Sequence, residues 1–260
     1  MTGLRIALQT SCLRQPLRKA LNNTAQIGCE GVEIDARSEL RPAEMSGTAL
    51  RQLRKILADL NLRIAAVTFP TRRGYSDPDQ LQARVEATLA AMQLASQLKA
   101  RVLVCYLGSL PEQQSSPDRA TLMDVLATLS AQGNRLGVQI AARTEAADLS
   151  NLKDLFAQLP EQALGLDFNP ARLIDQEILP AHFLAELGQH VVHVHATDGV
   201  PDLASGRSTE VELGRGTADY PELLGLLEEH AYRDWLTVGR HDAQQPLEEA
   251  GNAVQYLRAL

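Results

Sequence analysis

The chain has 260 residues, enough for one large domain, and 45 % of them are hydrophobic, so a sizeable core is expected and disorder is not. The formal net charge of −7 argues against nonspecific nucleic-acid binding, which needs a basic surface, and equally against binding to an anionic membrane surface. Three cysteines without a CxxC spacing, no signal-peptide core and no run of about 20 apolar residues favour a cytoplasmic protein.

Short apolar segments alternate with amphipathic helical patterns along the whole chain. Leu50, Leu53 and Leu57, for example, recur at helical spacing between the second and third apolar segments. Eight strand–helix pairs predict an α/β fold, a parallel eight-stranded (β/α)8 TIM barrel that spans residues 1–260 as a single domain. A doubly wound open sheet is the alternative, but no GxGxxG motif or P-loop follows the first predicted strand. The predicted strands are Arg5–Thr10, Gly31–Ala36, Arg63–Phe69, Arg101–Leu107, Val138–Thr144, Ala163–Asn169, Val191–Thr197 and Trp235–Arg240.

Two of the predicted connections are long, Pro70–Gln80 after the third strand and Gly199–Asp219 after the seventh. Long ordered loops after barrel strands usually shape a binding site. Arg72 in the first loop is either a solvated charge or part of an anion clamp. Arg215 lies between two glycines in the second loop, where it could approach a ligand. We therefore keep Arg72 and Arg215 as substrate-binding candidates.

The alternation of the seventh strand predicts which side chains enter the barrel. In the segment VVHVHATD, Val192, Val194 and Ala196 are expected to face the helices, which leaves His193 and His195 facing inward. Strand ends hold the active sites of barrel enzymes, so this pair is a candidate for the site. The structural alternative is a histidine pair in which one ring is a satisfied core residue.

The same parity places ionisable residues of three other strands inside the barrel. Glu33, Asp167, Arg143 and Glu145 each lie opposite an apolar face that would pack on the helices. Charged groups are buried at low cost only with partners or water, so these residues are expected to line a wet pocket at the C-terminal mouth. For Glu33, a structural ion-pair network under the mouth is the alternative.

The strand-six aspartate, the segment HVHATD and the run LGRGTADYPELLGLLEEHAYRDWLTV resemble the xylose isomerase-like barrel superfamily. The start, with IGCEGVEID, also fits, so the resemblance covers essentially the whole chain. This superfamily includes sugar-phosphate isomerases/epimerases, ketose 3-epimerases, inosose dehydratases and endonuclease IV. The resemblance implies carbohydrate metabolism, a small-molecule sugar or anionic metabolite as ligand, and a site at the mouth.

Members with a working metal site use a Glu on strand five, an Asp on strand six, a His on strand seven and a Glu on strand eight. By position, Asp167 and His195 match the Asp and the His, whereas the two Glu positions are occupied by Arg143 and Gly239. The resemblance therefore implies no bound metal; Mn, Mg, Co or Zn is expected only if a site forms despite these two replacements. An arginine in this place can itself neutralise an anionic ligand, with Asp167 holding it.

Two functions remain open from the sequence. One is an isomerase or epimerase that still works, with Asp167, His195 and Glu145 as catalytic residues and Arg143, His193, Glu33, Arg72 and Arg215 as binding residues. The other is a non-catalytic or altered barrel that binds a sugar or an anionic metabolite without metal. A phosphodiesterase like endonuclease IV is disfavoured, because that activity needs a metal cluster rich in His and Glu. The sequence leaves homo-oligomerisation open.

Overall fold

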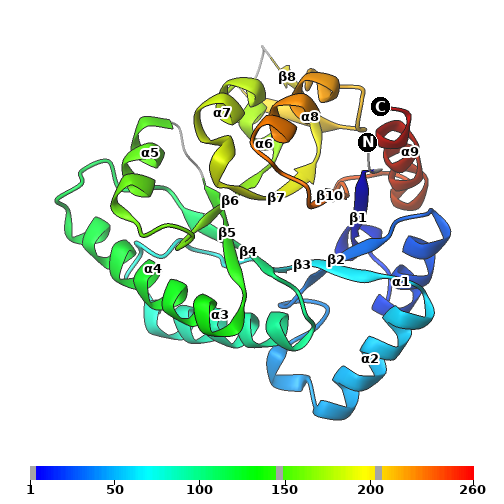
Figure 1. The fold of residues 1–260 in the computed structure, drawn as a ribbon, viewed down its shortest axis with the longest axis horizontal. Helices are drawn as coiled ribbons and strands as arrows, with labels where there is room; N and C mark the ends of the chain where they lie inside the picture. Colours follow the sequence, from blue (N-terminus) through cyan, green and yellow to red (C-terminus); the bar gives the residue numbers. More distant parts are fainter. Residues whose placement is uncertain (1–3, 145–148, 203–206) are drawn as a thin grey trace.

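The computed structural model describes residues 4–144, 149–202 and 207–260, and it shows a closed parallel barrel with helices around it (Figure 1). The strands follow one another around the barrel in chain order, and β10 closes it against β1, with Arg5 opposite Trp235. This confirms the predicted (β/α)8 architecture. The barrel strands are β1 (Arg5–Gln9), β2 (Gly31–Asp35), β3 (Arg63–Phe69), β4 (Val102–Gly108), β5 (Gln139–Thr144), β6 (Gly165–Phe168), β7 (Val191–Ala196) and β10 (Trp235–Val238).

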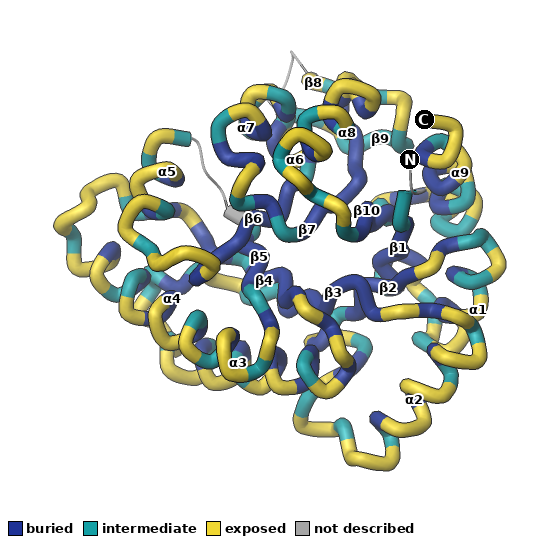
Figure 2. The backbone as a smooth tube through the Cα atoms, viewed as in Figure 1, coloured by how far each residue is buried: buried dark blue, intermediate teal, exposed yellow. Residues whose placement is uncertain are grey.

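The helices cover the outside of the barrel, and the tube in Figure 2 is mostly buried along the strands and exposed along the outer faces of the helices. Helix α2 shows the pattern: Leu50, Leu53 and Leu57 are buried, and the Ser46 side chain accepts a hydrogen bond from the backbone N–H of Ala49 at its start. None of the described helices is long and apolar enough to cross a membrane. The α-helices are α1 (Leu17–Gln26), α2 (Gly47–Asp59), α3 (Leu81–Gln97), α4 (Pro117–Leu136), α5 (Leu149–Gln158), α6 (Pro170–Asp175), α7 (Pro180–Leu187), α8 (Tyr220–Glu229) and α9 (Pro246–Ala259).

The predicted orientation of Val192 is wrong, although those of Val194 and Ala196 are confirmed. Val194 and Ala196 belong to the main core between strands and helices, whereas Val192 packs on a separate small cluster of residues from β3, β4 and β5. The cause is a register shift in the β6–β7 ladder. Leu166 pairs with Val191 but Asp167 pairs with His193, so Val192 is an extra residue that leaves the simple alternation.

The long connection after β7 contains an antiparallel hairpin that the sequence did not predict. Strands β8 (Asp198–Asp202) and β9 (Arg207–Val211) pair with each other outside the barrel, with Gly199 opposite Glu210. Helix α6 packs against both strands of this hairpin. The hairpin therefore starts directly at the C-terminal end of β7, beside the mouth.

Candidate functional site

Four buried ionisable side chains meet inside the barrel. Glu33 comes from β2, Asp167 from β6, and His193 and His195 from β7, and none of these side chains is more than 3 % exposed. Asp167 Oδ1 lies 2.8 Å from His193 Nδ1 and 2.7 Å from His195 Nδ1. Glu33 Oε2 lies 3.2 Å from His193 Nε2 and 3.0 Å from His195 Nε2. Each imidazole therefore bridges the same two carboxylates, and the predicted inward orientation of all four residues is confirmed.

Arg143 reaches this cluster from the end of β5. Its Nε donates a hydrogen bond to Asp167 Oδ2 over 3.1 Å, and its Nη2 lies 3.3 Å from His195 Nδ1 and 3.5 Å from His195 Nε2. The expected contact between Arg143 and Asp167 is thus present. The Arg143 side chain is 21 % exposed while Asp167 is fully covered. The guanidinium consequently lies between the buried cluster and the open mouth of the barrel.

The charges in this cluster stabilise one another. Burial opposes ionisation of Asp167, but the nearby charges of His195 and Arg143 hold its carboxyl pKa well below the usual range. Burial likewise opposes ionisation of Glu33, and both histidines lower its pKa. Burial alone would lower the pKa of His193, yet its contacts with Asp167 and Glu33 raise that pKa to about 9. The pKa of His195 is raised for the same reason, chiefly by Asp167. Two ionised carboxylates and a protonated His193 are the stable forms at neutral pH.

The end of β10 is shaped so that position 239 holds no side chain. Gly239 has a φ of +150°, and a Cβ built on it would lie 2.9 Å from Cys12 Sγ and 3.1 Å from Gln9 Cβ. The Gln9 side chain lies in this space and is held there by two hydrogen bonds. Its Nε2 donates one to Glu33 Oε1 over 2.8 Å, and its Oε1 accepts one from the Cys12 thiol. Side chains of the first βα segment therefore occupy the space where a residue on β10 would project into the mouth.

A buried aspartate holds the segment that follows the hairpin. Asp198 Oδ1 accepts hydrogen bonds from the backbone N–H groups of Gly199 and Ala218, and its Oδ2 accepts them from Gly214 and Gly216. A Cβ on Gly216 would lie 2.1 Å from Asp198 Oδ1, so the loop approaches the carboxylate too closely for any side chain. This contact gives the physical reason for the spacing between the aspartate of HVHATD and the glycines of LGRG.

Three polar residues that the sequence did not single out surround the mouth. Glu210 lies on β9, and Arg240, which follows β10, places Nη1 3.5 Å from the Glu210 carbonyl oxygen while its Nη2 pairs with Glu249 Oε2 at 2.6 Å. Burial raises the pKa of the Glu210 carboxyl against the opposing charge of Arg240. His241 is exposed, yet desolvation lowers its pKa and the charge of Arg143 lowers it further. Glu210 reaches the mouth because it lies on the hairpin. The hairpin has no clear signal in the sequence, so the sequence could not identify Glu210 as a mouth residue.

Arg72 and Arg215 are exposed loop residues outside the buried cluster. Arg72 is exposed in the loop after β3. The Arg215 side chain is 72 % exposed and forms an ion pair with Glu212 at 3.3 Å. Glu145 lies outside the described residues. Arg143, His193 and Glu33 are thus brought together with Asp167 and His195. The functional roles of all the predicted site residues stay predictions.

Three residues of the buried cluster carry atoms that could bind a metal ion. Glu33, His193 and His195 each offer one atom, and these atoms lie within 4.8 Å of one another. Glu33 Oε2 makes no hydrogen bond of good geometry, although both Nε2 atoms approach it. Among the described residues, this is the one group of three that could hold a metal ion.

Comparisons with known proteins give one family model and several solved structures of the same fold. The family model described as "Xylose isomerase-like TIM barrel" matches residues 21–260. A xylose isomerase domain protein from Planctomyces limnophilus is 21 % identical, with a TM-score of 0.82 over 92 % of this chain and 91 % of that one. A xylose isomerase-like TIM barrel protein from Mycobacterium smegmatis, solved in complex with magnesium, is 16 % identical, with a TM-score of 0.76 over 99 % and 96 % of the two chains. The 3-keto-D-glucoside 4-epimerase from E. coli is 14 % identical, with a TM-score of 0.77 over 99 % and 100 %. A search of curated protein sequences found no match.

Proposed function

Because the chain belongs to the xylose isomerase-like TIM barrel family, we propose that it acts on a sugar or sugar phosphate at the C-terminal mouth of the barrel without a divalent metal ion. The observation that carries this proposal is the place of Arg143. Its guanidinium contacts Asp167 and His195, the two residues that match the family's Asp and His ligands. The cationic Arg143 side chain thus lies beside the Asp167 and His195 atoms that would bind a metal ion in the family's site.

The residues present do not suit the family's metal ion. Arg143 and Gly239 hold the two positions where the family carries a carboxylate, and a side chain at 239 would overlap Cys12. A dication about 4 Å from the guanidinium would be repelled by about 8 kcal/mol at an effective dielectric constant of about 20. Asp167 already accepts three cationic or N–H partners. The positive charge that a metal ion would bring is therefore already supplied by Arg143 and the protonated His193.

The exposed side of Arg143 suits an anionic oxygen. In an isomerase or epimerase step, a base removes a proton from the carbon beside a carbonyl, negative charge moves to the carbonyl oxygen, and an acid returns the proton. The guanidinium of Arg143 can donate hydrogen bonds to that oxygen, or to a carboxylate or phosphate of the substrate. Asp167 fixes the orientation of the Arg143 guanidinium, so the guanidinium needs little rearrangement during the reaction.

Glu210 and His241 are the described mouth residues best suited to move the proton. The pKa of the Glu210 carboxyl is raised and that of His241 is lowered. His193 and His195 are nearly fully covered, so they support the site from below instead of contacting the substrate carbon. The predicted catalytic roles of His195 and Asp167 thereby become positioning roles in this proposal. Glu145 keeps its predicted catalytic role, as a third residue that could carry a proton.

The test is proton exchange in the absence of metal. The protein is incubated in D2O containing a chelator with a panel of ketoses and ketose phosphates, and NMR follows deuterium incorporation and new epimers. We expect exchange at the same rate with and without chelator. The Arg143→Met variant should lose it by a factor of about 100 or more, as when an oxyanion donor is removed. Arg37→Gln is the matched control, because Arg37 is exposed at the same end of the barrel and, among the described residues, its hydrogen bonds go to the Pro70 carbonyl and to its own loop.

Two results would contradict the proposal. One is exchange that disappears with the chelator and returns with Mg²⁺ or Mn²⁺, and the other is unchanged exchange in Arg143→Met. A binding function without catalysis is the second candidate, favoured by the replacement of both family carboxylates at Arg143 and Gly239. It predicts that a sugar or anionic metabolite binds, that Arg143→Met abolishes binding, and that no substrate proton exchanges in any condition.

A further inference from the structure

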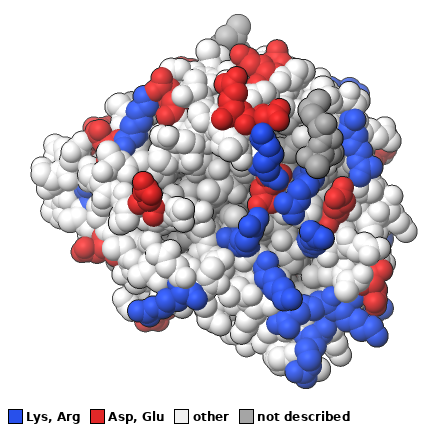
Figure 3. All heavy atoms as spheres, viewed as in Figure 1, with Lys and Arg blue, Asp and Glu red and all other residues white. Residues whose placement is uncertain are grey.

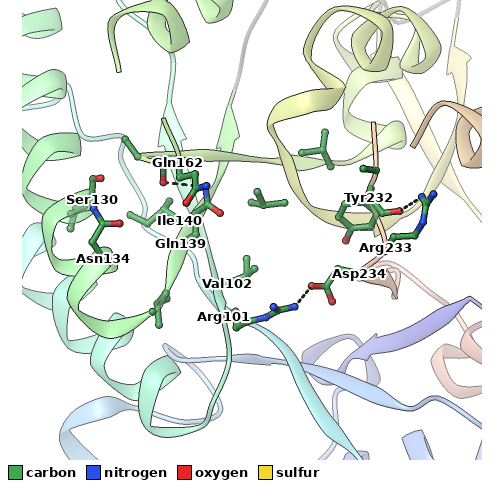
Figure 4. A pocket seen from close by; sticks show the side chains of 18 of the residues that line it. Arg101, Val102, Ser130, Asn134, Gln139, Ile140, Gln162, Tyr232, Arg233 and Asp234 are labelled. Carbon is green, nitrogen blue, oxygen red and sulfur yellow. Dashed lines mark hydrogen bonds and ion pairs between the residues drawn. The ribbon is translucent and has the colours of Figure 1, made fainter. Parts of the chain in front are cut away.

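A second cavity opens at the opposite end of the barrel. Its volume is about 580 Å³, and it is lined by residues at the N-terminal ends of strands, among them Arg5 of β1, Val102 of β4 and Gln139 of β5. Figure 4 shows the side chains of Arg101, Gln139 and Asp234 around this space. The volume lies within the range of about 300–1,000 Å³ that is typical of small-molecule sites. The cavity is separated from the mouth by the length of the barrel.

The short strand β6 explains why the cavity exists. Strand β6 begins at Gly165, which pairs with Ala141, so Gln139 and Ile140 at the start of β5 have no strand partner on that side. The side-chain nitrogen of Gln139 instead donates a hydrogen bond to the Gln162 carbonyl over 3.2 Å. The barrel wall is therefore incomplete at this end.

One wall of the cavity carries an excess of positive charge. Arg5 Nη1 lies 3.2 Å from Asp234 Oδ1, and Arg101 Nη2 lies 2.8 Å from Asp234 Oδ2, so two guanidinium groups share one carboxylate. Each guanidinium uses one nitrogen in this contact, and an arginine carries five N–H donors. Arg233 also lines the cavity, and its Nη2 pairs with Glu228 Oε1 at 3.2 Å, so the excess charge comes from Arg5 and Arg101. Figure 3 shows Lys and Arg side chains gathered around a hollow over the centre of the barrel.

The other walls differ in chemistry from this cationic side. Val102 and Val192, which pack in one small apolar cluster, supply an apolar floor. Ile140 and the amides of Gln139 and Asn134 also line the cavity. The Arg5 guanidinium is stacked 4.0 Å above the ring of Trp235, which fixes its orientation. A pocket with an apolar floor, neutral amides and a pair of partly neutralised guanidiniums matches a ligand with one anionic head and an apolar body.

We propose that this N-terminal cavity binds a small organic anion, with its carboxylate or phosphate on Arg5 and Arg101 and its apolar part against Val102 and Val192. The site is separate from the mouth and does not depend on the function proposed there. The Asp234 carboxylate competes with the ligand, because it pairs with both guanidiniums when no other anion is in the cavity. A ligand binds only if its anionic group interacts with Arg5 and Arg101 more favourably than the Asp234 carboxylate does.

Trp235 provides a direct readout, since it is the single tryptophan of the chain and lies under Arg5. Phenyl phosphate and benzoate are titrated into the full-length protein, with phenol as the uncharged analogue, while tryptophan fluorescence and calorimetric heat are recorded. We expect saturable binding of at least one of the two anions and none of phenol at the same concentrations. Arg101→Gln should weaken that binding about tenfold or more, because a charge-assisted hydrogen bond is lost. Asp234→Asn should strengthen it severalfold, because the competing charge is removed.

Two control variants locate the signal. Arg63→Gln removes an exposed arginine at the first residue of β3, outside the cavity lining, and should bind like the unmodified protein. Arg143→Met alters the mouth and should also leave this binding unchanged. Melting curves of Arg101→Gln and Asp234→Asn confirm that each variant is folded. The proposal is overturned if neither anion binds, if Arg101→Gln binds as well as the unmodified chain, if Asp234→Asn weakens binding, or if Arg143→Met abolishes it.

Discussion

The buried histidine pair makes the stability of the barrel depend on pH in a defined direction. The pKa of His193 is raised from 6.5 to about 9 in the folded chain by Asp167 and Glu33. A raised histidine pKa adds to the free energy of unfolding. This contribution is fully present below the pKa of the unfolded chain, about 6.5, and is lost as the pH rises through the folded-state pKa of about 9. The rise of the His193 pKa from 6.5 to about 9 corresponds to about 3 kcal/mol. Asp167 and Glu33 have lowered pKa values, so their contribution is present throughout this window and is lost only at acid pH.

Urea denaturation at a series of pH values from 6 to 10 measures this contribution. The free energy of unfolding should fall by about 3 kcal/mol across the window, and His193→Gln should remove that part of the slope. The variant should also be less stable at pH 6 by about 3 kcal/mol, since two buried carboxylates lose a cationic partner. His182→Gln, which alters an exposed histidine on α7, should follow the unmodified chain. A flat profile for the unmodified protein, or an unchanged slope in His193→Gln, would refute the reasoning.

Three substitutions test close contacts of the barrel by urea denaturation and amide hydrogen exchange. Gly165→Ala should cost about 1–3 kcal/mol, because its Cβ would lie 2.2 Å from Val192 Cγ2; no loss of stability would contradict that contact. Asp198→Ala should cost about 2 kcal/mol and speed amide exchange at the glycines of LGRG, since four N–H groups lose their acceptor. Gly239→Glu should cost about 2 kcal/mol, through its positive φ and its overlap with Cys12, and a variant as stable as the unmodified chain would contradict it.

Periodicity and parity were sufficient for the barrel and for the buried cluster. The strands carry apolar side chains on the face that meets the helices, so the ionisable residue in the alternate position had to point inward, as Glu33, Asp167 and Arg143 do. The distances could not be read from the sequence, because they depend on how three strands converge. Val192 shows the limit of parity: one extra residue in a ladder reverses the face, and the sequence carries no clear mark of it.

The hairpin beside the mouth could not be predicted for a different reason. Its strands DGVPD and RSTEV are short, polar and interrupted by Pro201, so they lack the apolar alternation that marks a half-buried strand. They are held by pairing with each other and by the Asp198 carboxylate, which are tertiary contacts. Glu210 was missed with the hairpin. The N-terminal cavity was missed because it depends on where β6 begins, and element boundaries are poorly encoded in a single sequence.

Metal content tests the central claim about Arg143 most directly. The protein is purified after expression in medium supplemented with Mn, Mg, Co and Zn, and the metal per chain is measured by mass spectrometry before and after brief dialysis against a chelator. Arg143→Glu, which restores a carboxylate beside Asp167 and His195, is measured in parallel. We predict far less than one ion per chain in the unmodified protein and a higher metal content in Arg143→Glu. Close to one ion per unmodified chain, retained through dialysis and lost in His193→Gln, would contradict the account and assign a metal to Glu33, His193 and His195.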